Sequence, residues 1–231
     1  GSLEVKNENT GGNGGTIVYR SDSGIITDVL SVAGGATLDI KDSTGNTTGT
    51  INLKSDSLEL EDGSTLNLAN GSTLVGHLKN SGNLGDWTNE SNIQGNFINA
   101  SGARVGDLIA GNIKDNLLNE GEITNLIINK NIGTLTNSGS ITALAVEGTI
   151  NNGIANDNNG IINSLTIQNN SIITNGITNN SNIGSLNLQE NVTYDGSGSI
   201  TNALDIAGTK TLNASTNGIN ILFNDDATGT I

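Results

Sequence analysis

The sequence predicts an all-β protein, a right-handed parallel β-helix of about eleven or twelve coils, and three observations support this prediction. First, a motif of the form Gly-x-Ile-x-x-Leu-x-Ile returns every 18–21 residues. A unit this short cannot bury a core alone and must stack on its neighbours. Second, apolar residues alternate in short runs broken by Asn, Gly and Ser, which is typical of strands and turns. Third, no window has the apolar spacing of an amphipathic helix.

The repeat is clearest in the carboxy-terminal two thirds of the chain. The regular copies begin at Gly121, Gly139, Gly160 and, with serine in the glycine position, Ser181. Residues 102–110 fit with one inserted residue, and residues 82–89 form a degenerate copy with Trp87 in the leucine position. Each copy is therefore expected to be one coil of the solenoid.

Alternation along a strand sends one side chain inward and the next outward, so the apolar positions of successive copies should stack in columns. Full burial of each such residue contributes about 1.5–3 kcal/mol, enough to hold a neighbouring coil but not to fold one alone. We also expect Ile172 and Ile177 to point inward, and Phe97 to share the leucine column with Trp87. The predicted interior columns contain Trp87, Ile123, Leu126, Ile128, Ile141, Leu144, Val146, Ile162, Leu165, Ile167, Ile183, Leu186 and Leu188.

Asparagines occur two residues before several of the repeat glycines. Their amides can hydrogen-bond along a stack of coils and fix the turn, so we expect a ladder at one corner of the solenoid. The predicted members are Asn80, Asn119, Asn137 and Asn158.

The chain is expected to form one domain. Residues 1–15 are interpreted as a cloning remnant (Gly1-Ser2) followed by a flexible leader or first turn, and residues 16–231 as a single β-helical fragment. Within it we expect shorter, less regular coils over 16–78 and regular coils over 79–231. Because the chain has no methionine, we expect it to be part of a longer protein.

Charge and composition argue against several classes of partner. The formal net charge is −14, with only nine Lys and Arg residues, whereas nucleic acids and anionic membranes are bound by clustered basic residues. With no cysteine and one histidine, a Cys/His metal cluster is impossible. The glycine-rich run 11–15 is similar to a calcium-binding repeat but lacks the aspartates that supply ligands. No metal or cofactor is therefore expected.

Two patterns could indicate an enzyme, and both have a structural explanation. Ser197 lies in a segment similar to that around a serine-protease nucleophile, but such a serine needs a histidine base, and the only histidine is His77. The segment also falls where the next coil should begin. Paired acids could serve a sugar-cleaving site, but these fall in turns or on outward positions, and aromatic residues are scarce. The acids considered are Glu59, Glu61, Asp62, Glu120, Glu122, Asp225 and Asp226. We expect no enzymatic activity.

The Asn-x-Gly-x-Ile copies at 119–123 and 137–141, together with Gly-Ser-Thr-Leu at 63–66 and 71–74, resemble the passenger domains of bacterial autotransporters. The resemblance covers nearly the whole chain. It implies a β-helical rod delivered by type V secretion to the bacterial cell surface or outside the cell, with a signal peptide upstream and a membrane barrel downstream as its only outer-membrane tether. Such passengers include adhesins, vacuolating-cytotoxin-like proteins and proteases, so the resemblance is specific for architecture and loose for function.

The function expected from these observations is virulence-associated adhesion by a structural rod. Its partner would be a host-cell surface protein or glycan, or another bacterium through self-association. Two alternatives stay open: a receptor-binding, oligomerising cytotoxin subunit, and a polysaccharide-active β-helix enzyme.

Overall fold

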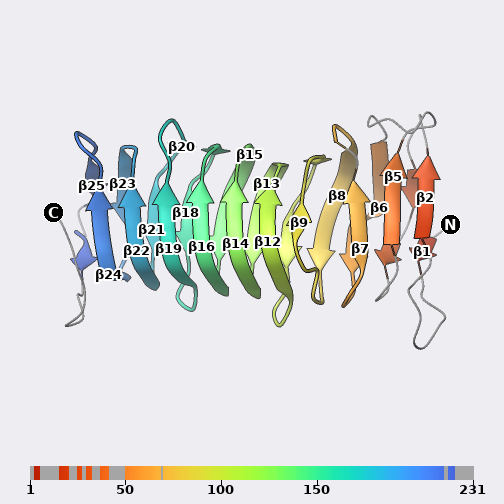
Figure 1. Cartoon of the computed structure of the whole chain (residues 1–231), viewed down its shortest axis with the longest axis horizontal. Helices are drawn as coiled ribbons and strands as arrows, with labels where there is room; N and C mark the ends of the chain where they lie inside the picture. The colour runs from red at the N-terminus through yellow and green to blue at the C-terminus, as the bar shows by residue number, and fades with distance from the viewer. Residues whose placement is uncertain are drawn as a thin grey trace.

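The strands stack in parallel as the coils of a β-solenoid, seen from the side in the computed structural model (Figure 1). In Figure 1 the near strands run upward and the far strands downward while the chain advances from right to left, so the coil is right-handed. The described residues contain no helix. The structure describes residues 50–68, 70–215 and 218–221, with side chains from residue 57, and upstream of these the strand segments 3–5, 16–20, 25–27, 30–32 and 37–41.

One wall of the solenoid, the front wall, faces the viewer in Figure 1 and consists of two sheets, one of three strands and one of eight. The three-stranded sheet contains β2 (Thr16–Arg20), β5 (Thr37–Lys41) and β7 (Thr65–Leu68). The eight-stranded sheet contains β9 (Trp87–Thr88), β12 (Arg104–Ala110), β14 (Glu122–Ile128), β16 (Ser140–Val146), β19 (Ile161–Ile167), β22 (Asn182–Leu188), β24 (Ser199–Ile206) and β26 (Asn220–Ile221).

The remaining strands form one sheet of fifteen, the back wall, which bends so that some coils contribute two short strands in place of one long one. Its amino-terminal strands are β1 (Leu3–Val5), β3 (Ile25–Thr27), β4 (Leu30–Val32), β6 (Thr50–Leu60), β8 (Thr73–Asn80), β10 (Asn92–Ile93), β11 (Phe97–Asn99) and β13 (Asn112–Asn119). It continues with β15 (Asn131–Asn137), β17 (Thr149–Ile150), β18 (Ile154–Asn156), β20 (Ile172–Ile173), β21 (Ile177–Asn179), β23 (Val192–Asp195) and β25 (Leu212–Ala214).

The coils of the solenoid differ in length. The front wall has eleven strands, one to each coil, in agreement with the eleven or twelve coils predicted. Coils near the amino end are longer than the short ones predicted there, since Leu30 pairs with Leu58 and the chain uses 28 residues to return to the same place. In the regular part, Leu126 pairs with Leu144, only 18 residues further on.

Stacked apolar columns fill the interior. Leu126, Leu144, Leu165 and Leu186 lie one above another on four successive strands of the front wall. Each is at most 2% exposed, and all the other residues predicted for the interior columns are also buried. Parallel strands with β-branched and leucine side chains in register give this columnar packing. The core thus consists of nearest-neighbour contacts between coils.

Two predictions about single apolar residues are wrong. Ile172 is 56% exposed, because in β20 its neighbour Ile173 pairs with the buried Ile150 and takes the inward position. A shift of one residue sends a side chain to the opposite face of a strand. Phe97 is buried but lies in the back wall, paired with Leu78 and Leu117. Its ring stacks across the core on Trp87, with centroids 5.6 Å apart.

Candidate functional site

A ladder of buried asparagines runs along one corner of the solenoid, where back-wall strands end. Each side-chain amide donates to the amide oxygen of the asparagine on the next coil, as from Asn119 Nδ2 to Asn137 Oδ1 at 2.8 Å. The same nitrogen also donates to the carbonyl of the first residue of a front-wall strand, here Ser140 O at 3.2 Å. The members of the ladder are Asn80, Asn99, Asn119, Asn137, Asn156 and Asn179, all fully buried.

The predicted position of the ladder differs from the structure in one coil. Asn158 is exposed, and Asn156 occupies the corner in its place. The turn after Asn156 contains two extra residues before Gly160, so counting back from the glycine selects a turn residue. Asn99 and Asn179 also belong to the ladder and were not predicted. A better signal is the triplet apolar-x-Asn at the end of a back-wall strand.

Tyr194 ends the ladder at its carboxy-terminal side. It stacks on Ile177 in the apolar column, and its ring carries the hydroxyl to within 2.8 Å of Asn179 Nδ2, which donates to it. Burial raises the pKa of the Tyr194 hydroxyl above its ordinary value. The hydroxyl therefore stays protonated at neutral pH, and the ladder acts as structural support rather than as a reactive site.

The structure separates the two residues considered for serine-protease chemistry. Ser197 lies in the turn after β23, beside Asp195, which accepts hydrogen bonds from the backbone of Gly196 and from Ser215 Oγ. His77 lies on β8 and its Nδ1 accepts a hydrogen bond from the backbone nitrogen of Asn96 at 2.8 Å. Six strand steps of about 4.8 Å each separate β8 from β23, far beyond hydrogen-bond reach.

The acids considered for sugar cleavage are dispersed. Glu59 accepts a hydrogen bond from Ser81 Oγ and lies 3.3 Å from Lys79 Nζ, and these contacts hold its pKa below the ordinary carboxyl value. Glu122 pairs with Arg104 Nε at 3.1 Å. Glu61, Asp62 and Glu120 are exposed turn residues. Asp225, Asp226 and the glycine run 11–15 lie outside the described residues, among which no three acidic or histidine side chains gather as a metal site.

Two of the grooves on the described outer surface are lined by side chains of several successive coils. One lies on the front wall, has a volume of about 320 Å³ and is mainly apolar. Its outward residues come from β12, β14, β16 and β19 and include Ile109, Ile127, Ala143 and Ala145, with Asp107 on one border. Asp107 accepts a hydrogen bond from Asn125 Nδ2 at 2.5 Å, which fixes that border. This face offers shallow apolar contact rather than an enclosed cleft.

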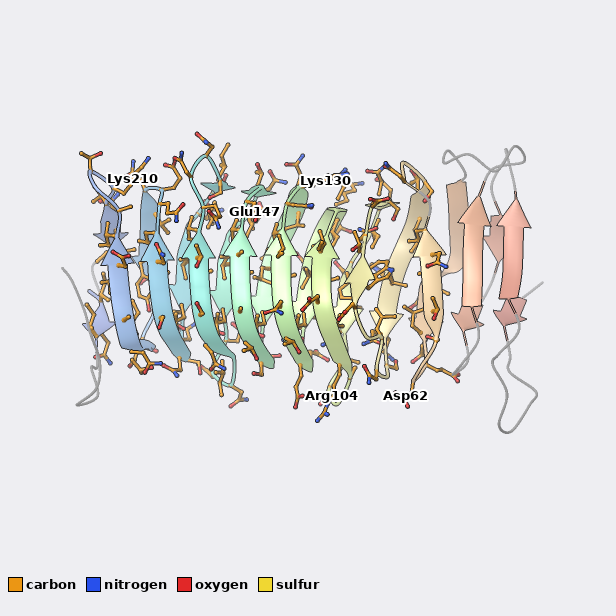
Figure 2. The ribbon with its side chains drawn as sticks, viewed as in Figure 1. Asp62, Arg104, Lys130, Glu147 and Lys210 are labelled. Carbon is orange, nitrogen blue, oxygen red and sulfur yellow. The ribbon has the colours of Figure 1, made fainter. Side chains whose placement is uncertain are left out.

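A second groove, with a volume of about 330 Å³, lies on the outer face of the back wall. Side-chain amides line it, and Lys114 lies among them. Figure 2 shows side chains projecting from the rod over the part whose side chains are described, with Lys130, Glu147 and Lys210 along its upper edge. Both grooves are formed by outward-facing residues. The sequence repeat marks only inward positions, so the sequence analysis predicted neither groove.

A carboxylate at the upper edge joins three coils. Glu190 accepts a hydrogen bond from the backbone nitrogen of Asn170 on the preceding coil and pairs with Lys210 Nζ on the following coil, each at 2.9 Å. These contacts, the Asn170 bond first, lower the pKa of Glu190 below its ordinary value. A carboxylate whose pKa is lower in the folded state than in the unfolded state stabilises the fold at pH values above its ordinary pKa of about 4.3. This stabilisation is lost as the pH falls through the lower pKa of the folded state.

Replacing Glu190 with glutamine should therefore reduce the acid sensitivity of the protein. We expect the urea midpoint of the wild type to fall more steeply than that of Glu190→Gln below about pH 4.5, and the two to differ by a constant amount near neutrality. Equilibrium urea unfolding at several pH values, followed by circular dichroism, measures this difference. Equal acid sensitivity of the two proteins would contradict the role assigned to Glu190.

Comparison of the chain with protein-family models, curated proteins and solved structures finds no match. Within the part of the chain that the structure describes, there is no helix long and apolar enough to cross a membrane. The fold and the surface chemistry therefore carry the functional argument.

Proposed function

We propose that this chain is the β-helical rod of an autotransporter passenger, presented at a bacterial surface or secreted, where it acts in adhesion. The observation that supports this most directly is the regular face of the front wall. Five strands from β12 to β22 stack in register, and β24 continues the stack after one register shift. The outward side chains of the five strands form parallel columns spaced by one strand separation, about 4.8 Å.

A face of this kind suits binding through many weak contacts. Its outward residues are small, polar or aliphatic, and the groove around Ile127 adds apolar area to which a partner surface can pack. The net charge of −14 makes copies of the rod repel one another, which keeps them separate. Several rods on one surface would then gain affinity through effective concentration rather than through one tight site.

The adhesion proposal predicts that attachment depends steeply on surface density. Beads coated with the protein at graded densities should attach to cultured epithelial cells with a density dependence steeper than linear, because several contacts must form together. Counting attached beads after a fixed wash measures this dependence. If beads at every density attach no better than uncoated ones, the adhesion proposal is wrong.

A pair of substitutions tests whether the front-wall groove takes part. Ile127→Lys places a charge in the groove, whereas Ile161→Lys makes the same change at an exposed isoleucine on β19 outside it. We expect the first variant to reduce attachment several-fold and the second to leave it close to that of the wild type. Equal attachment of the two variants would move the contact surface away from the groove.

A further inference from the structure

The groove on the back wall is built as a set of hydrogen-bond donors. Asn92 on β10, Asn112 on β13 and Asn131 on β15 follow one another along it. Asn112 Nδ2 donates to Asn92 Oδ1 at 2.8 Å, and Asn112 Oδ1 accepts the backbone nitrogen of Asn131 at 3.3 Å. These bonds use acceptor oxygens and orient the amides, while the amide nitrogen of Asn92 keeps its hydrogens for a ligand.

Two further side chains extend this donor set. Gln94 and Lys114 are exposed, line the same groove and make no side-chain hydrogen bond to other described residues. Lys114 can donate three hydrogen bonds, and Gln94 can both donate and accept. Asn112 and Asn151 donate within the wall of the groove, Asn151 to the carbonyl of Ile132 at 3.0 Å. Asn92, Gln94 and Lys114 are therefore the donors that the described residues leave available to a ligand.

Two lysines of the described region pair with no carboxylate, and one of them lies in this groove. Five lysine and arginine side chains are described, and three of them pair with glutamates: Lys79, Arg104 and Lys210. The other two are Lys114, in the groove, and Lys130, which directly precedes the groove residue Asn131 and lies at the upper edge of the rod in Figure 2. In a chain with a net charge of −14, Lys114 thus places a cation without an ion pair among a row of amides.

We propose that this groove binds a saccharide that carries a carboxylate. The amides match the hydroxyl groups of a sugar, and Lys114 with Lys130 matches the acid through charge-assisted hydrogen bonds. The inference rests on the proposed adhesive function, because it names the chemistry of the partner surface. The groove has no aromatic platform, so one site binds weakly, and an array of rods would supply the avidity.

Carboxylates near the groove limit its positive charge and sharpen the expectation. Asp115 follows Lys114 and is exposed, and Glu147 lies near Lys130 along the same edge in Figure 2. A doubly charged or highly charged polyanion would meet these acids, whereas one carboxylate on a sugar ring can pair with Lys114 in the groove.

Calorimetric titration of the whole chain with 3′-sialyllactose, lactose and inorganic phosphate tests the proposal. We expect saturable binding of sialyllactose with a dissociation constant of about 1 mM, and weaker binding of lactose and of phosphate. The double variant Lys114→Gln/Lys130→Gln should weaken sialyllactose binding by about tenfold or more. The matched control Lys79→Gln removes one positive charge on β8 outside the groove and should change the affinity by less than about twofold.

Three results would overturn the saccharide site: no saturable binding of sialyllactose, equal binding of lactose, or equal binding of phosphate, which would indicate a simple anion site. Circular dichroism of the variants checks that the exposed substitutions leave the fold intact. The bead assay separates this inference from the adhesion proposal. Attachment without sialyllactose binding removes only the saccharide site, and sialyllactose binding without attachment removes only adhesion.

Discussion

Replacing Asn119 with alanine is expected to lower the free energy of unfolding by about 3–5 kcal/mol. Asn119 is fully buried in the middle of the ladder, and its side chain serves coils on both sides. Alanine would leave Asn137 Oδ1 without its donor and would leave Asn99 Nδ2 with only the carbonyl of Glu122 as acceptor. Each buried polar group left unsatisfied costs about 1–3 kcal/mol, and the lost amide volume adds a cavity.

The ladder also joins the two walls, which increases the expected effect. Asn119 Nδ2 donates to the carbonyl of Ser140, the first residue of β16, so the substitution frees a backbone acceptor at the start of a front-wall strand. Because each coil of a solenoid depends on its neighbours, damage here weakens two interfaces at once. The effect should therefore exceed that of any exposed asparagine.

The matched control for this prediction is Asn158→Ala. Asn158 is exposed in the turn before Gly160, so its replacement should change stability by no more than about 0.5 kcal/mol. Urea unfolding of both variants, followed by circular dichroism, measures the difference. Similar midpoints for the two variants would show that the ladder is not a source of stability.

The sequence repeat predicts the interior of this protein better than its surface because burial imposes a period and exposure does not. Leu126 and Leu144 must stack to exclude water, so their spacing is visible in the sequence. Ile172 and Ile173 are adjacent apolar residues, and only the pairing of β20 with β17 decides which one points inward. Periodicity alone cannot make that choice in a two-residue strand.

The ladder was predictable in part for the same reason. Asn119 and Asn137 follow a fixed apolar-x-Asn pattern that the regular coils preserve. Asn156 obeys the pattern too, but its turn is longer, so a rule anchored on the glycine fails there. The back-wall groove is different, since Asn92, Asn112 and other outward asparagines have no distinguishing context in so asparagine-rich a chain. Only the folding of the chain into stacked coils brings them together beside Lys114.

Replacing Gly139 with alanine should destabilise the fold by at least about 3 kcal/mol, for a reason that is steric rather than conformational. Gly139 opens one of the regular repeats and does not have a positive φ. A Cβ at this position would overlap the backbone carbonyl oxygen of Gly121 on the preceding coil and lie 2.7 Å from the carbonyl carbon of Glu120. Because these are backbone atoms, no side chain can move aside to relieve the overlap.

The repeat glycine is thus required by the close approach of turns on successive coils. Asn137-Ser138-Gly139 lies directly on Asn119-Glu120-Gly121, where the backbone nitrogens of Ser138 and Gly139 donate to the carbonyl of Asn119. Gly160 has no room for a Cβ either, although its turn is longer than the one on which it lies.

Gly208→Ala provides the contrasting control. Gly208 has a φ of 54°, and a Cβ at this position would have no neighbouring atom within 4 Å. Alanine there should lower the free energy of unfolding only by the cost of a left-handed backbone conformation, about 1–2 kcal/mol. We expect the urea midpoint to fall far more for Gly139→Ala than for Gly208→Ala. Equal decreases of the urea midpoint in the two variants would mean that neighbouring coils can move apart at this corner. Tight stacking of the turns would then not explain the glycine of the repeat.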